Sequence, residues 1–327
     1  MALGFFGDRM AMWRSERPPR KGNYLGGSFM KLPEIDGYTQ SVNPGNTRDL
    51  IGRYSYSLSA VDRAVEHALT VRSRWHRTSI ANRKVLLERF AQGLTSLKEA
   101  LVAMIVREVG KPTWEAELEF KAAIKFIELT CEQGPQALEP LHIPELDAMT
   151  EQHPWGVTAI PGAFDRPLLS PLPLLVPALL AGTPVVFTPR RYTPTVGPLI
   201  AESIDRSKFP RGVFNMVQGR GRQVGERLIT HGDVNAVLME GALPTAKRMQ
   251  RILADQPWKH LSCRTCARGT AIVLDDAELD KAIYELVIGA YLTTGQRRSS
   301  TCRVLVTSGI SDRFIQRLGA VANRIGI

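Results

Sequence analysis

The stretch VTAIPGAFDRPLLSPLPLLVPALLAGTPVVFTP, residues 157–189, decides the fold class. It begins with a short apolar run at 157–160, ends just after a second run at 185–187, and holds the chain's longest apolar segment, 167–182, between them. Short apolar runs separated by a helix-sized segment predict parallel strands. The apolar segment is too short to span a bilayer and contains four prolines, so we expect it to lie in the core.

The same alternation continues beyond this stretch. Apolar runs at 213–217 and 236–239 predict two more strands, and helical patterns follow near 193–206, 221–230 and 244–255. Strands that alternate with helices are typical of a parallel sheet covered on both faces. The predicted fold class is therefore α/β, with a Rossmann-type parallel sheet and helices on both of its faces.

The part of the chain before the sheet is predicted to be helical. Apolar residues recur there at spacings of three and four, which places them on one face of a single long helix that ends at Gly110 and Pro112. A further helix is predicted over 114–131. The residues of the apolar face are Leu87, Phe90, Leu94, Leu97, Leu101 and Met104.

Composition suggests three parts. Residues 1–23 form a basic N-terminal extension, because the first 22 carry five basic and two acidic side chains. Residues 24–256 form a dinucleotide-binding-type domain, in which the polar stretch 140–154 is a hairpin excursion. Residues 257–327 contain two predicted strands and two helices and are expected to be an incomplete catalytic-type domain of the α/β class.

The net charge of +10 and the four cysteines exclude several kinds of protein. No stripe of aromatic and basic residues appears, so we do not expect nucleic-acid binding. Cys263 and Cys266 form a lone CxxC pair, and zinc sites need about four ligands, so no metal is expected. No membrane span or secretory signal is found, which favours a cytoplasmic protein.

Five segments in colinear order resemble the aldehyde dehydrogenase superfamily. Within it, GKPTWEA and LVPALLAG look most like succinylglutamate semialdehyde dehydrogenases. The resemblance covers roughly residues 24–327. The segments are NPGNTRDLIG (43–52), GKPTWEA (110–116), VPALLAGTPVVFTP (176–189), PRGVFNMVQGRGRQVG (210–225) and YLTTGQR (291–297).

The resemblance implies a cysteine thiolate that attacks the aldehyde, followed by hydride transfer to nicotinamide. The family's cysteine position corresponds to Arg298, and a guanidinium has no nucleophilic lone pair. Cys302 lies four residues later, roughly 13 Å along an extended strand, whereas such sites tolerate about 1 Å. We expect Cys302 to be a packed strand residue and an implausible substitute nucleophile.

Two other catalytic positions of the family also differ here. The oxyanion-binding asparagine corresponds to Asp165, whose ionised carboxylate accepts hydrogen bonds and repels an oxyanion; this change costs on the order of 10²–10³ in rate. The general-base glutamate corresponds to Thr265, which is no base near neutral pH. No Asp or Glu occurs between Trp258 and Leu274, so a shift of the alignment does not restore the base.

The ribose-binding lysine and glutamate of the family correspond to Thr188 and Arg191. The resemblance thus implies that the usual contacts to the adenosine ribose are lost.

The family's Thr-Gly-Ser turn, which faces the pyrophosphate, corresponds to Glu240, Gly241 and Ala242, and a later glycine corresponds to Ala246. Gly241 is retained, whereas Glu240 is expected to place negative charge near a negatively charged ligand. No cofactor is therefore expected, although the resemblance alone would admit NAD(P).

These replacements predict a catalytically inactive family member that serves as a structural or regulatory subunit, with a protein partner covering the incomplete second domain. Three alternatives remain. The chain could be an NAD(P)-binding sensor without turnover, an active NAD(P)-dependent semialdehyde oxidoreductase, or a remnant without function.

Overall fold

A computed structural model describes residues 22–265 and 269–326. The basic extension predicted for 1–23 lies almost wholly outside the described residues, as does Cys266 of the CxxC pair. Contacts between residues divide the chain into two compact units. The first comprises 1–240 and 245–264, and the second comprises 241–244 and 265–327.

A seven-stranded sheet forms the centre of the first unit, in the order β11-β10-β7-β8-β9-β1-β2. Strands β10, β7, β8 and β9 are parallel neighbours, and β1 and β2 extend the sheet as antiparallel strands. The strands are β1 (Asn23–Leu25), β2 (Ser28–Met30), β7 (Thr158–Pro161), β8 (Val185–Thr188), β9 (Phe214–Met216), β10 (Ala236–Gly241) and β11 (His260–Thr265).

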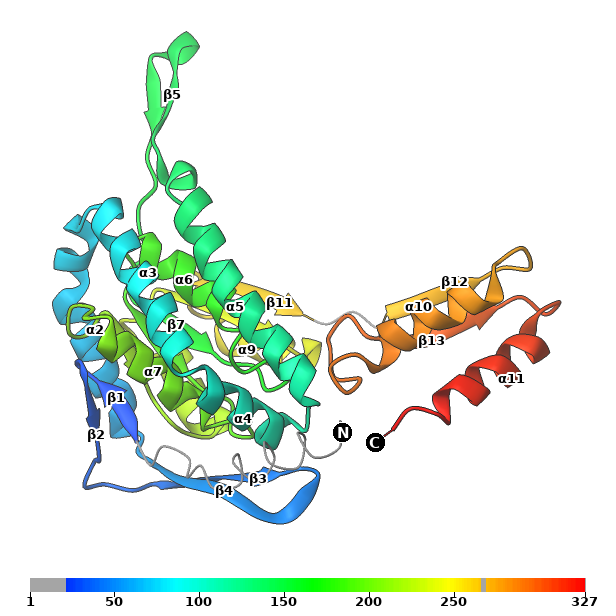
Figure 1. Cartoon of the computed structure of the whole chain (residues 1–327). Coiled ribbons are helices and arrows are strands. Elements are labelled where there is room, and N and C mark those ends of the chain that lie inside the picture. Colours follow the sequence, from blue (N-terminus) through cyan, green and yellow to red (C-terminus); the bar gives the residue numbers. More distant parts are fainter. Residues whose placement is uncertain (1–21, 266–268, 327) are drawn as a thin grey trace. The chain divides into compact units, whose positions relative to one another are not determined.

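Helices cover both faces of this sheet (Figure 1). On one face Ile160 and Phe187 join a core formed with α3 to α7, and on the other face Ala159 and Val186 join a core formed with α2, α8 and α9. Neighbouring strand residues thus alternate between two buried cores, as a doubly covered sheet requires. The helices are α2 (Ser59–Arg77), α3 (Ile80–Ser96), α4 (Lys98–Val109), α5 (Thr113–Gln133), α6 (Leu172–Leu180), α7 (Val196–Arg206), α8 (Glu226–Thr230) and α9 (Leu243–Ile252).

The single long helix predicted for the N-terminal half is wrong. The structure has two helices there, α3 and α4, because the backbone leaves the helical region at Leu97, which has φ −106° and ψ 11°. Leu87 and Leu101 on either side are still buried, so the apolar spacing continues across the break. Gly110 ends α4 in a left-handed conformation, as predicted.

Two hairpins extend the first unit. Strands β3 (Gly37–Asn43) and β4 (Asn46–Tyr56) form a separate antiparallel pair. Strands β5 (Leu141–Ile143) and β6 (Ala148–Thr150) pair within 140–154, where a hairpin excursion was predicted. Figure 1 shows β5 projecting beyond the end of α5. No helix of the described residues is long and apolar enough to cross a membrane.

The second unit contains β12 (Gly269–Val273), α10 (Leu279–Tyr291), β13 (Thr301–Val306) and α11 (Ser311–Ala322). Its two strands are parallel, and its core contains Val273, Leu286 and Phe314.

The division between the units differs from the predicted boundary before Pro257. It lies after Arg264, because β11 is a strand of the large sheet and the His260 amide donates to the Asn235 carbonyl.

Candidate functional site

Asp165 lies in the loop between β7 and α6, beyond the carboxyl end of β7. Its side chain is buried, and Oδ2 lies 3.7 Å from Nε of Arg166. Ligands in open α/β sheets bind beyond this edge of the sheet. The structure therefore places Asp165 where a site residue is expected, but pairs it with a cation from its own loop.

Arg166 connects Asp165 to a second acidic residue. Its Nη2 donates to Oε1 of Glu240 at 3.0 Å, and Ser170 Oγ donates to the same oxygen at 2.8 Å. Glu240 is buried near the end of β10, and β10 pairs with β7, so neighbouring strand ends bring these residues together. We call Asp165, Arg166, Ser170 and Glu240 the acid–arginine cluster.

The cluster corrects the expectation for Glu240. Its carboxylate does not face the site as an unbalanced negative charge, because Arg166 and Ser170 both donate to it. Two positions in the cluster are charged where the family resemblance implies uncharged residues: Asp165 stands in place of an asparagine, and Glu240 in place of a threonine. Arg166 was not among the predicted site residues, although the sequence held one signal for it: a cation that follows directly after the new acid Asp165.

A buried ion pair holds the loop that carries this cluster. Glu119 on α5 accepts from the backbone amides of Leu168 and Leu169 at 3.0 and 3.1 Å, and Lys111 donates to its other oxygen. Both side chains of the pair are almost completely buried. The segment GKPTWEA therefore contains Lys111 and the start of α5. The Glu119 carboxylate of this helix holds the loop backbone shortly after Asp165.

The two ribose positions lie at and after the end of β8. Thr188 is buried, and its hydroxyl finds no hydrogen-bond partner among the described residues. Arg191 is exposed; it donates to the hydroxyl of Tyr192, and its guanidinium lies 4.3 Å from the centre of that ring. Burial lowers the pKa of the neighbouring Arg190.

The remaining cofactor positions lie around the start of α9. Gly241 is the last residue of β10, Ala242 follows it, and Ala246 is buried within α9. Neither alanine has a polar side chain to offer a phosphate. The lysine, glutamate and serine that the family resemblance implies are thus replaced by Thr188, Arg191 and Ala242.

The catalytic positions of the second unit form a separate group. Arg298 lies between α10 and β13, shortly after Thr293, Thr294 and Gly295, which all have positive φ. Cys302 lies in β13 as predicted, but it is exposed rather than packed. Its thiol donates to the Ser300 carbonyl at 3.3 Å.

Thr265 is the last residue of β11. The residues after it, 266–268, which complete the predicted general-base segment, lie outside the described part of the chain. Within 22–265 and 269–326, no group of three or more His, Cys, Asp or Glu side chains could hold a metal ion.

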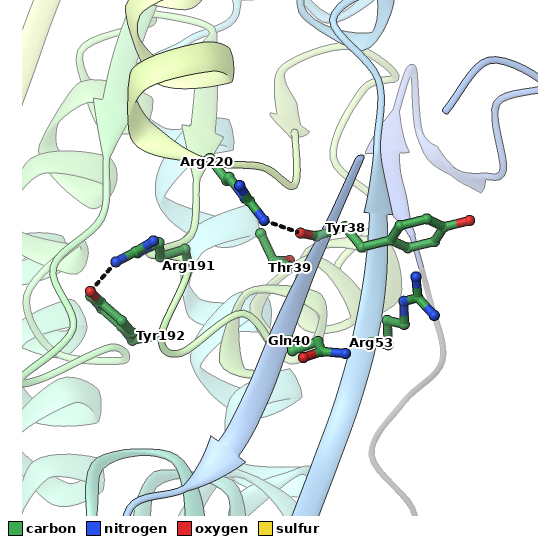
Figure 2. A pocket seen from close by; sticks show the side chains of 7 residues that line it. All are labelled: Tyr38, Thr39, Gln40, Arg53, Arg191, Tyr192 and Arg220. Atoms are coloured by element: carbon green, nitrogen blue, oxygen red, sulfur yellow. Dashed lines mark hydrogen bonds between the residues drawn. The ribbon is translucent and has the colours of Figure 1, made fainter. Parts of the chain in front are cut away.

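A pocket of about 430 Å³ lies beside β3 in the first unit (Figure 2). Of its residues, Arg191 alone is a predicted site position. We call it the arginine pocket. It is lined by Tyr38, Thr39, Gln40, Arg53, Arg191, Tyr192 and Arg220.

Comparison with known proteins identifies the family. The model of the aldehyde dehydrogenase family matches residues 33–327. The chain belongs to the aldehyde dehydrogenase family. This confirms the resemblance seen in the five sequence segments, including the likeness to the succinylglutamate semialdehyde branch.

The N-succinylglutamate 5-semialdehyde dehydrogenase of Escherichia coli O9:H4 (strain HS) is 36% identical over 271 residues, covering 81% of this chain and 54% of that relative. The protein of the same name from Shigella boydii serotype 18 has the same identity and coverage. The chain thus spans about half the length of the curated relatives it matches.

Solved structures confirm the predicted α/β fold. HpcC from Thermus thermophilus superimposes with a TM-score of 0.90 and 26% identity, over 97% of this chain and 62% of HpcC. PnpE in complex with nicotinamide adenine dinucleotide gives a TM-score of 0.87 and 26% identity, over 94% of this chain and 63% of PnpE.

Proposed function

We propose that this aldehyde dehydrogenase-family chain does not oxidise aldehydes and acts as a structural or regulatory subunit. The observation that carries the proposal is the acid–arginine cluster, which places two buried carboxylates and one guanidinium in the region of the oxyanion donor. An oxyanion needs donors that are not already engaged, and a nearby carboxylate repels it. Arg298 at the family's thiol position removes the covalent route as well.

A turnover assay tests the absence of chemistry. The purified chain is incubated with N-succinylglutamate 5-semialdehyde and either NAD or NADP, with the Escherichia coli relative as the positive control. We expect no reduced cofactor above the background of a heat-denatured sample. Turnover that disappears in Cys302→Ser would identify Cys302 as a nucleophile and overturn the proposal.

The second unit supports the proposal of a protein partner. Parallel sheets are normally covered on both faces. Here one face of the β12–β13 sheet packs on α10 and α11, while Ile272 and its register partner Leu305 are 69% and 50% exposed on the other. Leu274, which directly follows β12, is also exposed. We propose that a separate polypeptide covers this apolar face.

Copurification from the native source, followed by size-exclusion chromatography with mass detection, tests the partner. We expect a stoichiometric assembly that dissociates when Ile272→Asp and Leu305→Asp are combined. The matched control is Tyr284→Asp on α10, which also places a charge at an exposed apolar position. A lone chain, or an assembly that the double variant leaves intact, would contradict the proposed surface.

An NAD(P)-binding sensor without turnover is the second candidate. Arg190 and Arg191 follow β8, and Arg191 stands where the family has a glutamate. Two adjacent guanidinium groups favour a 2′-phosphate and therefore NADP over NAD. Titration of both dinucleotides by calorimetry separates this candidate from the first. Saturable binding of NADP supports the sensor, and no saturable binding of either dinucleotide at millimolar concentration rejects it.

A further inference from the structure

We propose that a groove between α3 and α5 binds residues 1–21 of the same chain, the main part of its basic N-terminal extension. The two helices pack against each other in the first unit (Figure 1), and the groove between them has a volume of about 430 Å³. The proposal does not depend on whether the chain oxidises aldehydes.

The inner wall of the groove is apolar. Ile127 and Cys131 of α5 are buried, and Ile124 beside them is partly buried. Burial, and to a smaller extent the charge of Glu88, raises the pKa of the Cys131 thiol to about 11. The thiol therefore stays protonated at neutral pH and adds to the apolar surface.

The rim of the groove is acidic. Glu88 and Glu128 line it, and no basic side chain does so among the described residues. Lys84 lies 3.9 Å from Glu88 and Lys125 lies 3.5 Å from Glu128, but both pairs are exposed. Exposed pairs of this kind contribute little to stability, so both carboxylates remain available to the arginines of an occupant.

The first 21 residues combine apolar and basic side chains in an order that fits this groove. Six large apolar residues occur within 3–13, and four of the five basic residues follow within 14–21. Apolar side chains gain free energy when an apolar surface removes them from water. The six apolar residues are Leu3, Phe5, Phe6, Met10, Met12 and Trp13.

Two side-chain contacts connect the start of β1 with one end of the groove. Tyr24 donates to Asp205 of α7 at 3.2 Å, and the next residue, Arg206, donates to Ser96 at 2.8 Å. Ser96 directly follows Thr95, which lines the groove. A segment that precedes β1 therefore has to cross only α7 to reach this end.

The segment is long enough for this path. Nine extended residues, such as 14–22, cover about 30 Å, which is sufficient to cross α7. Residues 3–13 are then left for the groove. The helical stretch of α3 from Glu88 to Thr95 is only about 10 Å long, so these eleven residues can fill the groove without being fully extended.

A fluorescently labelled peptide of residues 1–21, titrated against the full chain and followed by anisotropy, tests the proposal. The first sample is the full-length variant Phe5→Asp with Phe6→Asp, whose own segment should no longer fill the groove. We expect saturable binding to this variant. The native chain should bind the peptide at least tenfold more weakly, because its tethered segment competes at an effective concentration of about millimolar.

Charge reversal in the same variant tests the rim of the groove. Adding Glu88→Lys and Glu128→Lys should weaken peptide binding about tenfold or more at low ionic strength, because the arginines are then repelled. The matched control adds Glu66→Lys and Glu285→Lys, which change the net charge equally at exposed positions outside the groove. The control should leave peptide binding within about twofold of the value before charge reversal.

Three results would overturn the proposal. The first is the absence of saturable binding, or an equal loss in the control variant. The second is equal affinity for the native chain and for Phe5→Asp with Phe6→Asp, which would show that the groove is open to another molecule. The third is a dimer, measured by size-exclusion chromatography with mass detection, that dissociates in this variant, because the segment would then bind a second copy.

Discussion

Glu108 on α4 has a buried carboxylate that joins two parts of the first unit. Its carboxylate accepts from Ser41 Oγ at 2.5 Å and from the Thr195 amide at 3.1 Å, and so links hairpin β3–β4 to the start of α7. Burial raises the pKa of Glu108 to about 7, against the opposing effect of these hydrogen bonds. The protonated form is therefore favoured in the fold relative to the unfolded chain.

The sign of the resulting pH dependence follows from the raised pKa. The folded state holds the proton up to about pH 7, whereas the unfolded chain releases it near 4.5, so the free energy of unfolding falls by about 3 kcal/mol as pH rises through that window. Glu108→Gln should remove this part of the slope in denaturant titrations at several pH values. Glu66→Gln, at an exposed position on α2, is the control and should keep it. Equal slopes in all three proteins would refute the prediction.

Arg166 gives a second prediction at the same scale. Arg166→Leu leaves Asp165 and Glu240 buried without their cation, and we expect a loss of about 1–3 kcal/mol, because Arg166 itself is 28% exposed and partly screened. Adding Asp165→Asn and Glu240→Gln should recover most of the loss. Urea unfolding of the single and triple variants measures both values, and additive losses would show that the three charges are not coupled.

At the scale of the elements, α5 fixes the site loop through the buried pair Lys111–Glu119. Removing one partner of a buried ion pair typically costs about 3–5 kcal/mol. Lys111→Met should therefore destabilise the chain by about that amount in urea unfolding. The control is Lys125→Met, within α5, whose pair with Glu128 is exposed; it should change stability by less than about 1 kcal/mol. Similar losses in both variants would show that the buried pair has no special role.

Local sequence patterns predicted β7, β8, β9 and β10, because these strands are buried on both faces and appear as short apolar runs, but did not predict β1, β2 or β11 of the same sheet. The same patterns did not predict the break at Leu97, since the apolar spacing continues through it. Arg166 and Glu240 are 74 residues apart, and only the pairing of β7 with β10 brings them together. The sequence thus placed Asp165 after one strand and Glu240 near the end of another, but it did not predict the ion pairs that Arg166 makes with both.

At the scale of the whole molecule, the two units have very different cores. The first has two extensive apolar clusters, whereas the described part of the second has a single cluster of five buried apolar residues, so we expect the second unit to unfold first. The described tryptophans, Trp75, Trp114, Trp155 and Trp258, all belong to the first unit. The fluorescence of these four residues therefore reports on the first unit, while far-ultraviolet circular dichroism reports on both.

Thermal unfolding of the chain should then give non-coincident transitions, with part of the dichroism lost before the fluorescence changes. Phe314→Ala removes a buried ring of the second core and should lower only the first transition, since such truncations cost about 3–5 kcal/mol. Phe90→Ala, in the first core, should instead lower the fluorescence transition. Coincident curves in the native chain, or a fluorescence shift in Phe314→Ala, would mean that the two units unfold as one cooperative body.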